Sequence, residues 1–331
     1  MASVNLVARD NNVGLSSDLR LLAEALTDSG HSVHYSTLRR GKLRKWSRPL
    51  RMRARHLWQR LRGCEVYDVN LMLEHVRTED LPFAHLNLLI PNPEWCQPRD
   101  VKLLPRIDGV LLKTAHAQAI FAKFDCRLVY IGFTSEDRLD ACVARERAFF
   151  HLAGRSDNKG TETLLATWRK HPEWPRLTVL QNPRSARQGQ PAPNIEHRVD
   201  YIPDDELKRI QNAHRFHLCP SETEGFGHYL VEAMGVGGVV VTLDAPPMNE
   251  MVTPERGALI PYSRTGTKGL ATTYFYDQAA LEGVVERLLA TPDAALERMG
   301  IAARTWFEEN DRAFRRRIGD TIATLVASRT N

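Results

Sequence analysis

Short runs of apolar residues alternate with longer stretches of mixed polarity along the whole chain. In the first half the runs have the length of buried strands, and the stretches between them carry apolar residues at helical spacing. We predict strands at 4–8, 32–37, 66–73, 86–90, 109–112 and 128–131, and helices at 16–29 and 115–124. This alternation is typical of a parallel sheet covered by crossover helices, so the fold class is α/β.

A second series of the same kind follows the polar segment 135–147, which reads as a linker. Its predicted strands are 148–152, 177–181, 198–202, 214–219 and 238–243, with helices at 160–170, 204–213, 227–236 and from 278 onward. We therefore predict two Rossmann-like domains, 1–140 and 148–310, with a C-terminal helix at 311–331 packing back on the first. Parallel sheets bind ligands at the carboxyl ends of their strands, so we expect the chemistry in a cleft between facing domains.

Composition agrees with two domains of ordinary size, because the chain has 331 residues of which 43% are apolar and 26% charged. Its five cysteines are an odd number without a Cys-x-x-Cys pair, which indicates neither a disulfide framework nor a zinc site. We see no signal peptide and no run near eighteen apolar residues. We expect a cytoplasmic protein of a bacterium or phage-infected cell, with peripheral attachment to the inner membrane as an alternative.

The segment 219–234 carries the strongest functional signal. An apolar strand ends at Pro220, and Gly225 and Gly227 let the backbone turn sharply into an apolar helix. The unpaired N–H groups of the first helical turn and the helix dipole favour an anion there. A phosphate group fits that description.

Two glutamates, Glu224 and Glu232, flank this predicted anion site. Carboxylates beside a phosphate are unfavourable unless they accept hydrogen bonds from hydroxyl groups, which the two sugars of a nucleotide sugar supply. The pair alone also fits a solvated helix start, because acidic residues are common in first turns. The pattern favours a nucleotide-sugar site.

The string Pro-Ser-x-x-Glu-Gly-Phe-Gly-x4-Glu-Ala-Met at 220–234 resembles the signature of retaining glycosyltransferases with the GT-B fold. These form the glycogen-synthase-like and mannosyltransferase-like group known as family 4. The resemblance implies that Glu224 contacts hydroxyls of the donor sugar and Glu232 the ribose. It also implies that the backbone at Gly225, Phe226 and Gly227 contacts the phosphates and the sugar.

Two cations, Arg155 and Lys159, lie on the loop that follows the first strand of the second domain. A leaving nucleoside diphosphate gains negative charge in the transition state, so fixed cations there accelerate its departure. Each residue alone is more typical of a surface loop than of a functional site. Their joint position resembles the phosphate-binding arginine and lysine of the family, which makes both catalytic candidates.

Two further donor-binding candidates are Glu250 and Tyr201. The segment around Glu250 resembles the family's Pro-Glu segment, although Ala-Pro-Pro at 245–247 replaces the usual Gly-Gly and puts the sugar pocket in doubt. Tyr201 is predicted to end a strand and to flank the base, where packing alone is the simpler interpretation.

The first half resembles the family less. Gly14 follows the first strand, where relatives have a glycine-rich loop, and is a donor-binding candidate. His75 corresponds to the family's cleft histidine and is a catalytic candidate, and Glu94 after the next strand is an acceptor-binding candidate. A single histidine or glutamate at a strand end is more often structural than functional.

We find no Asp-x-Asp pair of the kind that holds a divalent ion in the other large glycosyltransferase fold. We therefore predict no metal site and no cofactor besides the nucleotide sugar as co-substrate. The resemblance implies a front-face displacement in which the departing phosphate helps to deprotonate the acceptor and the anomeric configuration is retained.

Residues 38–63 give the main indication of the acceptor. They contain eleven cations, and no acid lies between Asp28 and Glu65. A helix here would place tryptophan and leucine on one face and arginines opposite, as in an ordinary crossover helix with a solvated face or in a polyanion-binding helix. The predicted acceptor contacts are Arg44, Lys45, Arg48, Arg51 and Arg55.

Two polyanionic acceptors suit such a segment. DNA would place a hydroxymethylated pyrimidine over the cleft, as in phage-type DNA glycosylation. An anionic membrane would present a lipid-linked or envelope acceptor of a bacterial polysaccharide or glycolipid pathway. The density of arginines favours DNA slightly as the acceptor. We expect the donor to be a UDP-linked sugar. A nucleotide-sugar epimerase or hydrolase of the same fold is a third possible function. No protein partner is implied.

Overall fold

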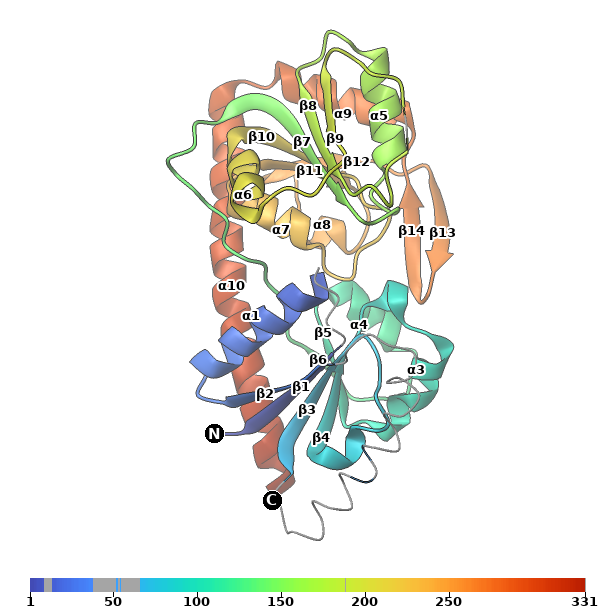
Figure 1. Ribbon diagram of the computed structural model, residues 1–331, viewed down its shortest axis with the longest axis vertical. Helices are drawn as coiled ribbons and strands as arrows, with labels where there is room; N and C mark the ends of the chain where they lie inside the picture. Colours follow the sequence, from blue (N-terminus) through green and yellow to red (C-terminus); the bar gives the residue numbers. More distant parts are fainter. Residues whose placement is uncertain (9–13, 38–51, 53, 55–65, 188, 331) are drawn as a thin grey trace. The chain divides into compact units, whose positions relative to one another are not determined.

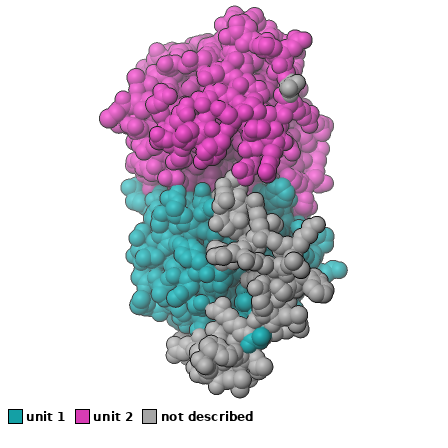
Figure 2. All heavy atoms as spheres, viewed as in Figure 1, with its two compact units in different colours: residues 1–134, 310–331 teal, residues 135–309 magenta. Residues whose placement is uncertain are grey.

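The computed structural model describes residues 1–8, 14–37, 52, 54, 66–187 and 189–330. The chain forms two compact units, residues 1–134 with 310–331 and residues 135–309 (Figure 2). Each unit contains its own six-stranded sheet with helices packed against it (Figure 1). The segment predicted as a linker, 135–147, belongs to the second unit.

All strand pairs of the first sheet are parallel, in the order β2-β1-β3-β4-β5-β6. Each strand begins and ends within two residues of its predicted range, because a buried parallel strand is a continuous apolar run. The strands are β1 (Ser3–Ala8), β2 (Ser32–Thr37), β3 (Tyr67–Leu73), β4 (Ala84–Ile90), β5 (Gly109–Leu112) and β6 (Leu128–Tyr130).

In the described part of the first unit, the helices are short apart from the first and the last. They are α1 (Gly14–Asp28), η1 (Leu81–Phe83), η2 (Pro93–Trp95), α3 (Pro98–Leu103), η3 (Leu104–Arg106) and α4 (Ala115–Phe121). The long α10 (Asp293–Thr330) starts in the second unit and contributes its residues from 310 onward to the first. There Phe314 packs against Phe133, with ring centroids 4.9 Å apart.

A row of buried asparagines crosses the middle of the first sheet. Asn5 on β1 donates to Asn70 on β3 (2.8 Å), and Asn70 donates to Asn87 on β4 (3.0 Å). The three residues are partners in the strand register. A slip of one residue would turn these amides to the other face and leave them unpaired, so the row specifies the register.

The second sheet is also parallel, in the order β12-β11-β10-β7-β8-β9. Its strands are β7 (Glu146–Gly154), β8 (Leu177–Gln181), β9 (Ile195–Arg198), β10 (His214–Cys219), β11 (Val239–Leu243) and β12 (Gly257–Ile260). The predicted strand at 198–202 is displaced, because pairing with β8 begins at Ile195 and ends at Arg198. Tyr201 therefore does not end a strand.

An antiparallel hairpin, β13 (Arg264–Lys268) with β14 (Ala271–Phe275), stands apart from this sheet in Figure 1. The pattern of apolar residues predicted neither the hairpin nor β12. The helices of the unit are α5 (Thr161–Lys170), α6 (Asp204–Ala213), α7 (His228–Gly235), α8 (Met248–Met251), α9 (Gln278–Ala290) and the start of α10.

Aromatic packing fixes the centre of the second unit. Phe149 on β7 stacks on Phe216 of β10 with ring centroids 4.5 Å apart and meets Trp168 of α5 edge-on at 4.8 Å. All three side chains are fully buried. Because the packing joins β7, β10 and α5, it also fixes the loops at the carboxyl ends of the two strands.

Candidate functional site

Two loops of the second unit meet beyond the carboxyl ends of β7 and β10. The amide of Glu222 donates to the carbonyl of Asn158 (2.9 Å), and Tyr276 donates to the carbonyl of Gly160 (3.0 Å). Gly160 has a φ of 65°, and a Cβ there would lie 2.7 Å from the carbonyl oxygen of Pro220. Glycine is therefore required for this close approach of the loops.

Lys159 and Glu224, predicted on separate loops, form an ion pair. The Lys159 Nζ lies 2.6 Å from the Glu224 Oε1, and each side chain is 15% exposed. The same oxygen accepts a hydrogen bond from the Ser221 hydroxyl (2.5 Å). In this structure the charge of Lys159 is thus compensated by Glu224.

Tyr229, on the first turn of α7, supports both members of this pair. The Lys159 Nζ lies 3.5 Å from the centroid of its ring, within cation–π range. Its hydroxyl shares a hydrogen bond with Ser221, which in turn holds Glu224. Burial raises the pKa of Tyr229 well above its ordinary value, so the phenol is neutral.

Sequence reasoning missed Tyr229 and gave Ser221 no role. Ser221 belongs to the quoted motif, and its place three residues before Glu224 across a tight turn was a usable signal. Tyr229 gave none, because an aromatic residue in an apolar helix is indistinguishable from core before the turn is known.

The turn into α7 has the geometry that its glycines predicted. Gly227 has a φ of 95° and precedes the first helical residue, His228. A Cβ at Gly227 would lie 2.7 Å from the Leu230 Cδ1, so both conformation and space select glycine. Gly225 and Phe226 are buried, and the Phe226 ring lies 5.5 Å from that of His228.

Glu232, the second motif glutamate, is half-buried one turn further along α7. Its Oε2 accepts a hydrogen bond from the Gln211 Nε2 on α6 (3.0 Å). Burial raises the pKa of Glu232 above its ordinary value, while the nearby positive charges of His228 and Arg138 act against that rise. The described contacts do not join Glu232 to the Lys159–Glu224 pair.

Among the described residues, no hydrogen bond or ion pair joins the remaining donor candidates to that pair. Arg155 is exposed just after β7, and among the described residues no hydrogen bond or ion pair reaches its side chain. Glu250 is half-buried in α8. Tyr201 is 85% exposed between β9 and α6, which gives the packing role no support.

In the first unit, His75 follows β3 and pairs with a buried carboxylate. Its Nδ1 lies 2.9 Å from the Asp100 Oδ2. Burial by itself raises the pKa of Asp100, but hydrogen bonds from His75 and from the Gln97 amide hold it below its ordinary value. The neighbouring Glu74 has a φ of 64°, which is unusual for a residue other than glycine.

The other first-unit candidates are placed only in part. Gly14 is the first residue of α1, and Glu94 is half-buried in η2. The predicted acceptor contacts lie outside the described residues, namely Arg44, Lys45, Arg48, Arg51 and Arg55.

The first unit also contains a lysine–carboxylate pair that sequence reasoning missed. The Lys113 Nζ lies 2.6 Å from the Asp18 Oδ2, and the two side chains are 4% and 5% exposed. Lys113 also donates to the Asn92 Oδ1 (3.1 Å) and lies 4.5 Å from the centroid of the Phe133 ring. Ninety-five residues separate Lys113 from Asp18, so no local pattern marks the pair.

Within the described part of the chain, no cluster of three or more histidine, cysteine, aspartate or glutamate side chains has the arrangement of a metal site. Within the same residues, no helix combines the length and apolarity needed to cross a membrane.

Residues 194–306, which include both motif glutamates, match the family described as Glycosyl transferases group 1. A curated relative, the alpha-maltose-1-phosphate synthase of Mycolicibacterium smegmatis, is 24% identical over 163 residues. The matched part is 49% of this chain and 40% of that protein, so the chain spans less than half of that relative's length.

Solved structures resemble almost the entire chain. Sucrose-phosphate synthase from Thermosynechococcus elongatus has a TM-score of 0.73 at 16% identity, covering 99% of this chain and 100% of that one. Anabaena HepE, solved in complex with UDP and glucose, has a TM-score of 0.68 at 13% identity, covering 98% and 100%. The predicted α/β class and GT-B fold are confirmed, and so is the resemblance to glycosyltransferases of that fold.

Proposed function

We propose that this chain, which carries a Glycosyl transferases group 1 domain on the GT-B fold, transfers a sugar from a UDP-linked donor to an acceptor hydroxyl with retention of configuration. The observation that carries the proposal is the pairing of Lys159 with Glu224 where two sheet-end loops meet. Ligands of parallel sheets bind at this end of the strands. The UDP complex of HepE supports the choice of nucleotide.

The donor would be bound by an exchange of partners. Lys159 leaves Glu224 for the diphosphate, whose charge is larger, and the exposed Arg155 adds a second cation. Glu224 is then available to accept hydrogen bonds from donor-sugar hydroxyls while Ser221 still donates to it. Glu232 accepts hydrogen bonds from the ribose. As the glycosidic bond breaks, Lys159 and Arg155 stabilise the charge that develops on the leaving phosphate.

Retention follows if the acceptor attacks from the side on which the phosphate departs. The leaving phosphate oxygen then takes the proton of the attacking hydroxyl, so no side-chain base is needed opposite the leaving group. NMR of the product should show the same anomeric configuration as the donor. An inverted product would contradict this mechanism, but it would not contradict the proposed donor-binding residues.

We also propose that transfer needs no divalent cation, because the sequence has no Asp-x-Asp pair and the site supplies lysine and arginine for the diphosphate. The rate should stay unchanged when a chelator is added to the purified enzyme. Loss of activity that added Mg²⁺ or Mn²⁺ restores would overturn this point.

For the acceptor we propose DNA that carries hydroxymethylated pyrimidines. Eleven cations without an acid across 38–63 provide the charge that a DNA backbone requires. The same cations would also favour an anionic membrane that presents an envelope acceptor. Binding to duplex DNA should fall steeply with salt, and the protein should not sediment with anionic liposomes. The opposite pattern would favour the envelope acceptor.

The deciding experiment incubates the purified chain with a panel of nucleotide sugars and either hydroxymethylated duplex DNA or bacterial lipid extract. Product mass is then measured, with unmodified DNA and the Lys159→Ala variant as controls. We expect one hexose-sized addition to hydroxymethylated DNA from a UDP-sugar. Addition to lipid alone would overturn the DNA acceptor, and release of free sugar without transfer would indicate a hydrolase or epimerase. A donor panel left entirely unchanged would overturn the proposed function.

A further inference from the structure

Arg138 is a nearly fully buried arginine outside the glycosyltransferase motif. Its side chain is 5% exposed, and its Nη2 donates to the Asp204 carboxylate (2.9 Å) and to the Asp204 carbonyl (3.0 Å) at the start of α6. Its Nε donates to the Gln211 Oε1 (2.5 Å) further along the same helix. Arg138 thus contacts both ends of α6.

Gln211 passes this contact on to the donor-site carboxylate. Its Oε1 accepts from Arg138 and its Nε2 donates to the Glu232 Oε2. A guanidinium can only donate and a carboxylate can only accept, so the orientation of the amide is fixed by its two neighbours. The result is a chain of hydrogen bonds from Arg138 through Gln211 to Glu232.

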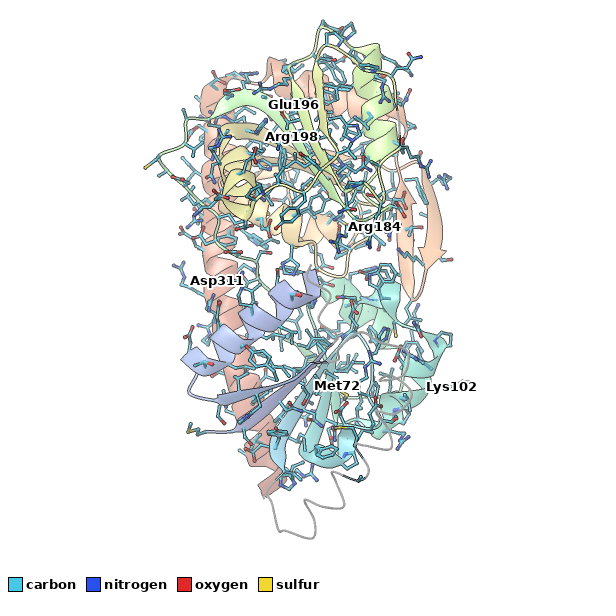
Figure 3. All side chains as sticks on the ribbon, viewed as in Figure 1. Met72, Lys102, Arg184, Glu196, Arg198 and Asp311 are labelled. Atoms are coloured by element: carbon cyan, nitrogen blue, oxygen red, sulfur yellow. The ribbon has the colours of Figure 1, made fainter. Side chains whose placement is uncertain are left out.

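The surroundings hold this chain of bonds in place. Asn212 donates to the Arg138 carbonyl (2.7 Å) and accepts from the Asp140 amide (2.9 Å). Arg198, labelled in Figure 3, donates to Glu206 (2.7 Å) and so ties β9 to α6. Both the backbone and the side chain of Arg138 are therefore anchored to the helix that carries Gln211.

Stability gives little reason for such an arrangement. A buried ionic group is often replaced by apolar residues without loss of stability, because its desolvation offsets its interactions. A Gln211 side chain that did no more than fill space could be leucine. Fixing the direction of a carboxylate, by contrast, requires a donor at a defined position.

We propose that Arg138 and Gln211 are positioning residues that hold the Glu232 carboxylate in place to accept hydrogen bonds from the ribose hydroxyls of the donor. The inference rests on the proposed function, because it takes the ligand of Glu232 to be a nucleotide. It goes further in assigning two residues outside the motif to nucleotide recognition.

Among the described residues, the charged or titratable groups that act on Glu232 include His228 of its own helix, Arg138 and Glu136 of the preceding segment, and Cys219 of β10. His228 and Arg138 favour the carboxylate, and Glu136 opposes it. Removing Arg138 or the Gln211 donor should therefore raise the pKa of Glu232 further. Nucleotide binding would then need a higher pH, which a purely structural residue would not cause.

The test is calorimetric titration of the full chain with UDP, 2′-deoxy-UDP and 3′-deoxy-UDP across a range of pH. Wild type should prefer UDP over one or both deoxy analogues by on the order of tenfold or more, the effect of a charge-assisted hydrogen bond. Gln211→Leu and Arg138→Met should reduce that preference to about twofold, as expected once the carboxylate is no longer oriented. Both should move the acid limb of UDP affinity to higher pH.

Arg145→Met is the matched control. Arg145 is a half-buried arginine of the same polar segment that donates to backbone carbonyls, those of Gly237 beyond α7 (2.6 Å) and of Asn212 at the end of α6 (3.4 Å). Its hydrogen bonds reach neither Glu232 nor the side chain of Gln211. This variant should keep the wild-type preference and pH profile. Gln211→Glu is the second test variant, because it keeps the size and the acceptor for Arg138 but loses the donor to Glu232. It should lose the preference even if Gln211→Leu does not fold.

The outcomes separate the two claims. A wild-type protein that binds no nucleoside diphosphate contradicts the proposed function. If wild type discriminates against the deoxy analogues but Gln211→Glu and Arg138→Met discriminate equally well, the positioning role is overturned. It is also overturned if Arg145→Met loses the preference to the same extent.

Discussion

Each unit contains a lysine that lies 2.6 Å from a carboxylate and above an aromatic ring, yet the two pairs differ in their surroundings. Lys113 and Asp18 are 4% and 5% exposed, and Asn92 provides a further acceptor for the ammonium. Lys159 and Glu224 are each 15% exposed and lie on loops at the carboxyl ends of their strands. The first pair is almost fully enclosed, whereas part of each side chain of the second is exposed to solvent.

The difference shows why an ion pair alone does not indicate function. A closed pair gains from low dielectric but cannot change partner without leaving a buried charge. A partly exposed pair is worth less to stability and can be exchanged for a stronger anion at small cost. We infer that Lys113 supports the fold of its unit and that Lys159 binds substrate.

The largest expected effect is on catalysis. Lys159→Ala should lower transfer by about a thousandfold or more, the usual effect of removing a group that stabilises transition-state charge. Glu224→Gln should also lower transfer strongly, because the donor-sugar hydroxyls lose their carboxylate acceptor. The melting temperature should hardly change, because the pair is partly exposed. Rates are measured with purified variants at saturating donor. Wild-type rates in either variant would contradict the site assignment.

Lys113→Met should lower the stability of the fold, in contrast to the two variants that lower the transfer rate. Leaving Asp18 buried without its cation should cost about 3–5 kcal/mol of unfolding free energy, and combining it with Asp18→Leu should restore much of the loss. Urea unfolding measures both variants. If Lys113→Met is as stable as wild type, or if adding Asp18→Leu does not restore the lost unfolding free energy, Asp18 is not left as a buried charge without its partner, and the assignment is wrong.

Low pH should destabilise the packing of β7, the strand that precedes the loop of Lys159. His151 joins β7 to β10 and α5 through the Leu218 carbonyl (2.7 Å) and the Thr161 hydroxyl (2.9 Å), and burial lowers its pKa to about 4. The unfolded chain therefore binds more protons between pH 6.5 and 4, so stability falls as pH falls through that window. At pH 5 the loss should be about 2 kcal/mol from this residue.

The change is read from urea unfolding at pH 7 and pH 5, with His151→Gln as the variant that cannot titrate. The variant should be less stable than wild type at pH 7 and should lose less between the two pH values. An equal loss in both proteins would exclude His151 as the cause.

The smallest expected effect is on the donor KM, and two substitutions of Tyr229 distinguish the contribution of its hydroxyl from that of its ring. Tyr229→Phe removes the hydroxyl that holds Ser221 but keeps the ring under Lys159, so donor KM should rise about threefold for one lost hydrogen bond. Tyr229→Leu removes the ring as well and should raise it about tenfold, since a cation–π contact adds a comparable amount. Equal effects of the two substitutions would mean that the ring does not support Lys159.

The sequence predicted most of the sheets because buried parallel strands are apolar runs, as at β8 and β10. It did not predict the hairpin β13–β14, whose first strand is Arg-Thr-Gly-Thr-Lys and has no apolar residue. The positions of Lys159 and Glu224 on loops could be predicted from the sequence, because each follows the end of an apolar strand and lies near glycines. Lys113 with Asp18, and Arg138 with Gln211, join residues whose proximity depends on tertiary packing.

The prediction of a polyanionic acceptor rests on the sequence alone, because the arginines at 44, 48, 51 and 55 lie outside the described residues. The proposed donor site does not depend on them. Its residues are placed by the aromatic packing of Phe149 with Phe216 and by the glycine turns at Gly160 and Gly227.

The central claim is that Lys159 exchanges Glu224 for the diphosphate of the donor, and the most direct test is the affinity for UDP. Titration calorimetry should show UDP bound to wild type, weakened by at least about tenfold in Lys159→Ala as one charge-assisted contact is lost. It should show tighter binding in Glu224→Gln, because the competing carboxylate is gone. Unchanged affinity in Lys159→Ala, or weaker binding in Glu224→Gln, would contradict the exchange.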